Sequence, residues 1–140
     1  MARHIRHDWT LEEVRELYNQ PLLDLVYQAS DVHRHFHQTD DIQKCTLVSI
    51  KTGGCPEDCG YCSQSVHHEA DLTREPLMGL EVIKQKAKQA REAGATRLCM
   101  GAAWRSAKKG KSFDTVLEMV KAVNAEGLES CVTLGMLNRE

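Results

Sequence analysis

Three cysteines lie within eight residues of one another, and thiols at this density are typical of a site that binds a metal. Cys55, Cys59 and Cys62 follow the spacing C-x3-C-x2-C, and Pro56 and Gly60 favour tight turns between them. A loop this short can surround one small inorganic centre. The chemistry it predicts is metal or cluster binding through thiolate sulfur.

Three kinds of site compete for these thiols: a disulfide framework, a structural zinc ion and an iron–sulfur cluster. The odd number of thiols and a reducing compartment argue against disulfides. A structural zinc ion needs four closed ligands, so Cys45, His67 or His68 would have to complete the set. A cluster of four irons usually takes four thiolates, so three would leave one iron open to a substrate or cofactor. Ligand softness and number favour the cluster, with zinc as the alternative.

Cys99 and Cys131 form a second pair of interest, because each lies on a predicted strand. One predicted helix separates the two strands, and in such a β-α-β unit the strands are normally neighbours, about 4.8 Å apart. Their sulfur atoms could then converge inside a barrel. The residues alone favour the alternative that both are small buried hydrophobic residues. Cys45 begins another predicted strand, and we expect it to be a core or surface residue rather than a ligand.

The elements predicted to position these cysteines alternate between strands and helices. Residues 45–50, 97–100 and 130–134 are short apolar or β-branched runs followed by glycine, which predicts strands. Residues 80–90 and 113–123 repeat apolar positions at helical spacing before a closing glycine. This alternation predicts an α/β fold with a parallel sheet. A (β/α) barrel fits best, and a doubly wound sheet is the second choice.

The residues before this pattern predict two short helices between 8 and 37. Thr10 and Glu13 have the spacing of a capping box, and Pro21 suits the first turn of the second helix. We expect residues 1–38 to form a helical extension and residues 39–140 to form the first part of a barrel. The histidines near the end of the second helix are expected on a solvated face, with a metal site as the alternative: His33, His35 and His37.

The composition is that of a globular protein. The chain has 140 residues, of which 41% are hydrophobic and 27% charged, with a net charge of −2. The slight acidic surplus argues against nucleic acid as a partner. No apolar run approaches the roughly 18 residues of a membrane span, and the N-terminus lacks a secretory signal. We therefore expect a cytoplasmic protein that does not bind a membrane.

The segments around the cysteines resemble a known family. The C-x3-C-x2-C motif with Tyr61 before its last cysteine resembles the cluster motif of radical S-adenosylmethionine enzymes. Residues 49–65, 99–104, 131–135 and 21–25 resemble the biotin synthase family in particular. The resemblance runs from about residue 9 to the end. It implies the N-terminal part of a (β/α)8 TIM-type barrel, namely its first three strands, preceded by two short helices.

The resemblance also implies an activity and two cofactors. Cys55, Cys59 and Cys62 would hold a [4Fe-4S] cluster whose fourth iron binds S-adenosylmethionine. Cleavage of this cofactor would give a radical that takes hydrogen from dethiobiotin. Cys99 and Cys131 would be two ligands of a [2Fe-2S] cluster that donates sulfur. The implied enzyme is a sulfurtransferase that forms biotin from dethiobiotin, the last step of biotin biosynthesis.

Further residues and partners follow from the same resemblance. Tyr61 would contact adenine, and a strand-end segment would line the S-adenosylmethionine pocket: Gly101, Ala102, Ala103 and Trp104. An electron donor of the flavodoxin or ferredoxin type, cluster-assembly proteins and a second copy in a homodimer are implied partners. Residues 66–71 depart from the family pattern, and the remaining [2Fe-2S] ligands and most substrate contacts would lie beyond residue 140. The alternatives are a radical enzyme with the first cluster only and a small iron–sulfur or zinc protein.

Overall fold

The structure is a computed structural model that describes residues 6–38 and 40–137. It divides into two units, residues 1–42 and residues 43–140. The first unit contains helices α1 (Leu11–Tyr18) and α2 (Leu22–Phe36), so the prediction of two short helices is confirmed. The capping box is present, because the Glu13 amide donates to the Thr10 hydroxyl and the Thr10 amide donates to the Glu13 carboxylate.

Both helices of the first unit are amphipathic, yet within these described residues neither has a buried side chain. The three histidines of α2 and its end are exposed, and the rings of His33 and His37 stack with their centroids 5.4 Å apart. This exposure agrees with the expected solvated face. Among the described residues, no helix is long and apolar enough to cross a membrane.

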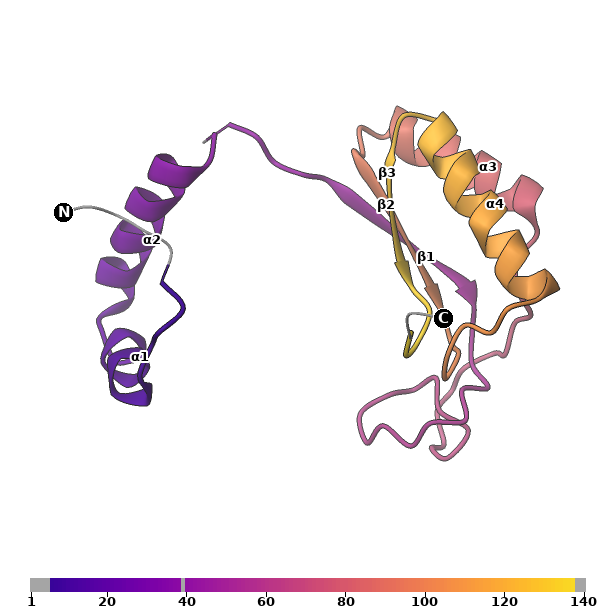
Figure 1. The fold of residues 1–140 in the computed structure, drawn as a ribbon, viewed down its shortest axis with the longest axis horizontal. Coiled ribbons are helices and arrows are strands. Elements are labelled where there is room, and N and C mark those ends of the chain that lie inside the picture. Colours follow the sequence, from indigo (N-terminus) through magenta and orange to yellow (C-terminus); the bar gives the residue numbers. More distant parts are fainter. Residues whose placement is uncertain (1–5, 39, 138–140) are drawn as a thin grey trace. The chain divides into compact units, whose positions relative to one another are not determined.

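The second unit is an α/β structure built on a parallel sheet (Figure 1). Strands β1 (Cys45–Lys51), β2 (Arg97–Ala102) and β3 (Glu129–Thr133) are neighbours in that order. Helices α3 (Leu80–Glu92) and α4 (Lys111–Ala125) connect them and lie on one side of the sheet. The predicted parallel α/β arrangement is therefore confirmed, with element bounds that differ from the predicted ones by a few residues.

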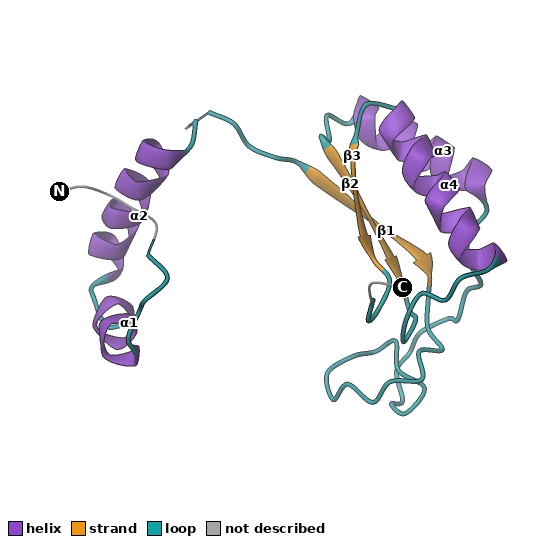
Figure 2. Cartoon of the chain, in the orientation of Figure 1, coloured by secondary structure: helices purple, strands orange, loops and turns teal. Residues whose placement is uncertain are grey.

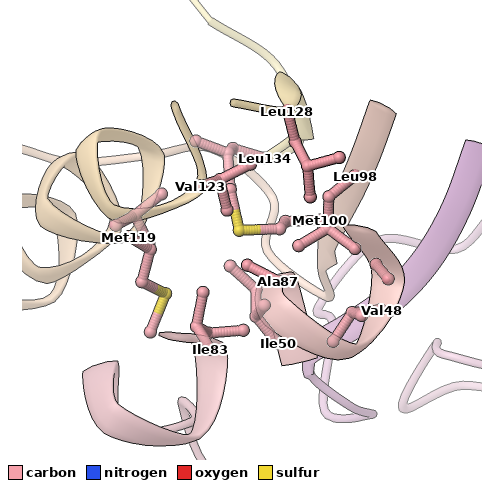
Figure 3. Close-up of a cluster of buried hydrophobic side chains, with 12 residues drawn as sticks. Val48, Ile50, Ile83, Ala87, Leu98, Met100, Met119, Val123, Leu128 and Leu134 are labelled. Atoms are coloured by element: carbon pink, nitrogen blue, oxygen red, sulfur yellow. The ribbon is translucent and has the colours of Figure 1, made fainter. Parts of the chain in front are cut away.

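The core lies between that side of the sheet and the two helices (Figure 3). Alternate strand residues point into it, since successive side chains of a strand face opposite sides. Ile83 from α3 and Met119 from α4 pack there with Leu98 and Met100 of β2, all four fully buried. Burying each of these side chains contributes on the order of 2 kcal/mol to stability. The core therefore fixes the position of β2 in the middle of the sheet.

The opposite side of the sheet carries the cysteines of the strands. Cys45, Cys99 and Cys131 occupy the alternate positions of β1, β2 and β3 that do not face the helices. Leu47 lies on the same side and is 73% exposed, which shows that this side is open to solvent at β1. Cys45 is exposed on this side of the sheet, whereas Cys99 and Cys131 are half-buried.

The carboxyl ends of the three strands meet at one edge of the sheet, as expected for a parallel arrangement. The long loop after β1 and the loop after β2 both leave from this edge, as the teal segments of Figure 2 show. The C-x3-C-x2-C motif lies in the first of these loops and residues 103–110 form the second. Residues far apart in the sequence are thereby placed at one edge.

Candidate functional site

The two strand cysteines lie side by side. Cys99 on β2 is the direct register partner of Cys131 on β3. The Cys99 thiol donates a hydrogen bond to the sulfur of Cys131 across a Sγ–Sγ distance of 3.4 Å. Burial raises the pKa of the Cys99 thiol, and the hydrogen bond with Cys131 adds to the rise. The predicted pairing of their strands is confirmed, and the two sulfur atoms do converge, while their role as cluster ligands stays a prediction.

On the same side of the sheet, two residues before Cys99 and Cys131, lies a charged pair. Arg97 on β2 is the register partner of Cys45 on β1 and of Glu129 on β3. Its Nη2 atom donates to Glu129 Oε1 over 2.6 Å. This hydrogen bond lowers the pKa of the Glu129 carboxyl. The Nε atom of Arg97 is buried without a hydrogen-bond partner among the described residues. An ion pair therefore adjoins the thiol pair at the amino-terminal end of the strands.

The three motif thiols lie on a loop that is closed by its own backbone. The Cys55 amide donates to the Gln64 carbonyl and the Val66 amide donates to the Cys55 carbonyl, both over 2.9 Å. Inside this closure, the Cys62 amide donates to the Cys59 carbonyl, also over 2.9 Å. Cys59 is exposed, whereas Cys55 and Cys62 are half-buried. The backbone therefore places the three thiols on one folded loop at the edge of the sheet.

A buried serine supports this loop from inside. Ser65 is 6% exposed, and its hydroxyl donates to the Glu57 carbonyl over 2.5 Å. The same oxygen accepts a hydrogen bond from the His67 amide over 3.1 Å. One side chain thus connects the segment between the first two motif cysteines with the segment after the last one. Sequence reasoning missed this residue, because a lone serine in a loop carries no pattern.

Two histidines also contact the backbone of the loop. His67 Nε2 lies 3.1 Å from the Pro56 carbonyl oxygen, and His68 Nε2 lies 3.0 Å from the Cys59 carbonyl oxygen. The sequence offered these histidines as ligands that would complete a zinc site. In the structure their Nε2 atoms contact carbonyl oxygens of the motif, so they act as supports of the loop.

Two cations connect the motif loop to the segment that follows β2. The Lys51 ammonium group donates to the Gly53 carbonyl over 2.6 Å and to the Ala103 carbonyl over 2.9 Å. Arg105 forms an ion pair with Glu57, which lies between the first two motif cysteines. Neither link could be predicted from the sequence, because both depend on how two loops approach each other in space.

The end of β3 is tied to the same segment by a close backbone approach. Gly135 has φ near +80°, and a Cβ atom at this position would lie 2.3 Å from the Trp104 carbonyl oxygen. The Met136 amide donates to the Arg105 carbonyl over 2.8 Å. Only glycine fits here, because both the backbone angle and the space exclude a side chain. The ends of all three strands are therefore joined.

The residues predicted to contact S-adenosylmethionine fall into two groups. Tyr61 is 96% exposed on the motif loop. The others belong to the end of β2: Gly101 pairs with Ser49 and Thr133, and Ala102 and Trp104 pack half-buried against the core. Trp104 also borders a cavity of about 370 Å³ next to the start of α4. The structure brings the strand-end residues to the edge that carries the motif loop, and leaves their binding role a prediction.

The thiols have the donor chemistry of an iron–sulfur site. All six cysteines are free, and thiolates are the ligands that such clusters take. Among the described residues, however, no three side chains of His, Cys, Asp or Glu are gathered as a metal-binding group. The residue types and their placement at one edge of the sheet fit a cluster, but the motif thiols are not drawn together around a centre.

Enzymes built on parallel β/α barrels hold their reactive groups at the carboxyl ends of the strands, and the motif loop of this chain follows such a strand end. Comparison with curated proteins gives the particular relatives, and these are biotin synthases. The chain is 55% identical over 139 residues to that of Zymomonas mobilis subsp. mobilis, covering 99% of this chain and 42% of the relative. It is 60% identical over 134 residues to the biotin synthase of Methylobacterium sp. strain 4-46, covering 95% of this chain and 40% of the relative.

A third biotin synthase, from Ruegeria pomeroyi, is 59% identical over 138 residues, which are 98% of this chain and 43% of the relative. The chain therefore spans about two fifths of the length of the curated relatives it matches. No family model matches it. The resemblance to biotin synthases read from the sequence is confirmed over nearly the whole chain.

Proposed function

We propose that this chain carries the thiol-rich part of a biotin synthase, a radical S-adenosylmethionine enzyme that inserts sulfur into dethiobiotin to form biotin. The observation that carries the proposal is 55–60% identity to biotin synthases over 95–99% of the chain. The site agrees with it, since the chain places five free thiols on one motif loop and two adjoining strands.

The fold proposal follows from the sheet. Strands β1 to β3 would be the first three strands of a (β/α)8 barrel, with residues 39–140 as the first part of the barrel and residues 1–38 as a helical extension. Three features support this arrangement: the strands are parallel, their order in the sheet is their order in the chain, and the helices lie on one side only. The open side of the sheet at Leu47 would then be the interior of the barrel.

Cys55, Cys59 and Cys62 would hold a [4Fe-4S] cluster, and a three-thiolate set would leave one iron for S-adenosylmethionine. When bound, this cluster would supply the electron that starts the radical chemistry. The other residues of this chain would hold the motif loop in a fixed orientation. Ser65 and the two following histidines fasten it internally, and Lys51 fastens it to the end of β2.

Cys99 and Cys131 would be two ligands of a [2Fe-2S] cluster, with the remaining ligands outside this chain. Their sulfur atoms are already neighbours, so the sheet itself orients two donors. Tyr61 would stack on adenine, which its exposed ring permits. Gly101, Ala102, Ala103 and Trp104 would line the S-adenosylmethionine pocket, supported by their place at the strand ends.

The same proposal includes the setting of the enzyme. Its substrate would be dethiobiotin, and its electron donor would be a small protein of the flavodoxin or ferredoxin type. Cluster-assembly proteins would load the two centres. The enzyme would act as a homodimer in the cytoplasm, without nucleic acid or membrane as partners. The substrate, electron donor, assembly proteins and dimer rest on the resemblance to biotin synthases, and the other points rest on charge and hydropathy.

The decisive experiment uses the full-length protein and three single variants, with iron content, visible absorption and two product assays as readouts. Cys59→Ala is expected to abolish S-adenosylmethionine cleavage. Cys131→Ala is expected to remove the absorption of the second cluster and to abolish biotin formation, while cleavage persists. Cys45→Ala is the matched control on the same sheet and should retain both. One zinc ion per chain with no charge-transfer bands would overturn the proposal.

A further inference from the structure

We propose that Cys99 and Cys131 form a reversible disulfide when no metal is bound to them, which makes the pair an oxidation-sensitive dithiol. Both thiols are free, and their sulfur atoms are already within hydrogen-bond distance of each other. This property belongs to the apoprotein and goes beyond a role as cluster ligands.

The geometry of the sheet permits the bond. Neighbouring strands lie about 4.7–4.9 Å apart. Disulfides bridge Cα atoms that are roughly 4.4–6.8 Å apart, so directly paired residues are within this range. The sulfur atoms are 3.4 Å apart, and a disulfide bond is about 2.05 Å long, so they must approach by about 1.4 Å. Side-chain rotation supplies a movement of this size, and the strands can keep their register.

The register of the strands also explains why the disulfide should join Cys99 to Cys131 and not to Cys45. Cys45 lies on the same side of the sheet and is more exposed, but its register partner is Arg97. Cys45 and Cys99 are therefore diagonal neighbours, offset by two residues along the strands. Among the strand cysteines that the structure describes, only Cys99 and Cys131 are directly opposite each other.

The step balances with glutathione disulfide as the oxidant. The thiolate of one cysteine attacks a sulfur of glutathione disulfide, forming a mixed disulfide and releasing one glutathione thiolate. The second cysteine then attacks the protein sulfur of this mixed disulfide and releases the other glutathione. The two cysteines lose two electrons, the oxidant gains them, and the two protons end on the two glutathione molecules. Excess reduced glutathione reverses the reaction.

The consequence for the enzyme rests on the proposed function. Metal ligation needs deprotonated thiols, and a disulfide offers none. Oxidation of the pair would therefore block loading of the second cluster, while the motif loop could still be loaded. Bound metal would in turn protect the pair from oxidation.

The test maps the disulfide directly. The metal-free full-length protein is treated with glutathione disulfide, the remaining thiols are alkylated, and tryptic peptides are analysed by mass spectrometry. Trypsin releases Cys99 in residues 98–105 and Cys131 in residues 122–139, whereas Cys45 lies in residues 45–51 and the three motif cysteines share residues 52–74. The expected product links residues 98–105 to residues 122–139, with a mass loss of about 2 Da.

Variants separate this pair from the other thiols. Cys45→Ser should leave the linked peptides unchanged, and Cys131→Ser should remove them. Replacing Cys55, Cys59 and Cys62 together by serine should also leave the link in place. Alkylation of both Cys99 and Cys131 after oxidation, or a link from either one to Cys45, would overturn the inference. Failure to form biotin would overturn the proposed function alone, since the mapped disulfide needs neither substrate nor metal.

Discussion

The two sets of thiols differ in what holds them. Cys99 and Cys131 are fixed by main-chain register in the middle of a sheet, and their sulfur atoms are 3.4 Å apart. The motif thiols lie on a loop held by a buried serine, two histidines and two cations. The sheet places two thiols directly side by side, whereas the described residues of the loop keep three thiols close in sequence without gathering them as a metal-binding group.

This difference follows from how each region is stabilised. The strand pair rests on a buried core, so its geometry is maintained as long as the domain is folded. The loop rests on individual polar contacts, each of which contributes only about 0.5–1.5 kcal/mol. Metal binding is commonly coupled to local ordering, and the loop is the region where that coupling should be found.

The largest effect should come from the core beneath the strand pair. Leu98 precedes Cys99 and is fully buried, so Leu98→Ala is expected to cost about 2–5 kcal/mol of unfolding free energy. Denaturant unfolding followed by circular dichroism measures this cost. Leu47→Ala is the control, because Leu47 is the register partner of Cys99 on the open side and is 73% exposed. An equal cost for both variants would contradict the assigned core.

A smaller effect is expected where the loop is fastened to β2. Lys51→Met removes both hydrogen bonds from the Lys51 ammonium group and leaves two carbonyl groups without this partner, at a cost of about 1–3 kcal/mol. Hydrogen exchange of residues 53–66 should accelerate, while the yield of the disulfide between Cys99 and Cys131 stays constant. Lys84→Met, which removes an exposed helical ion pair, is the control. Slower or unchanged exchange of the loop would refute its dependence on Lys51.

Ser65 tests the loop from inside. Ser65→Ala removes the hydrogen bond to the Glu57 carbonyl and the one from the His67 amide, at a cost of about 1–2 kcal/mol. Alkylation of Cys62, which is half-buried, should become faster in the metal-free protein. Exposed Ser63 provides the matched variant Ser63→Ala, for which the alkylation rate should not change. If both variants behave alike, the buried serine does not support the loop.

The smallest effect concerns the ion pair beside the strand thiols. Arg97 lowers the pKa of the Glu129 carboxyl below its ordinary value of 4.5. The pair therefore stabilises the folded state above about pH 4.5, and this contribution is lost as the pH falls through the lower pKa of the folded state. Carboxyl chemical shifts recorded against pH should place the Glu129 midpoint below its ordinary value of 4.5. Arg97→Gln should raise this midpoint, because the largest cause of the lowered pKa is then removed, and a midpoint unaffected by the change would exclude the assignment.

The sequence was sufficient to predict the helices and strands and to place Cys99 and Cys131 on neighbouring strands. Glycines after each strand and apolar periodicity in each helix are local signals, and a β-α-β crossover makes neighbours of Cys99 and Cys131. The supports of the motif loop were not predictable. Lys51, Ser65 and His68 act through carbonyl groups whose positions depend on the folded path of the loop, and no spacing rule describes such contacts.

The order of the strands in the sheet is the order of the strands in the chain, and this has a consequence for synthesis on the ribosome. When β2 or β3 leaves the ribosome, the strand beside it in the sheet has already been synthesised. The sheet can therefore be extended at one edge as translation proceeds. Cys131 follows Cys99 by 32 residues, which take roughly 2–6 seconds to synthesise. During that interval the nascent chain carries Cys99 without its partner thiol, so the disulfide proposed above can form only after Cys131 has been synthesised.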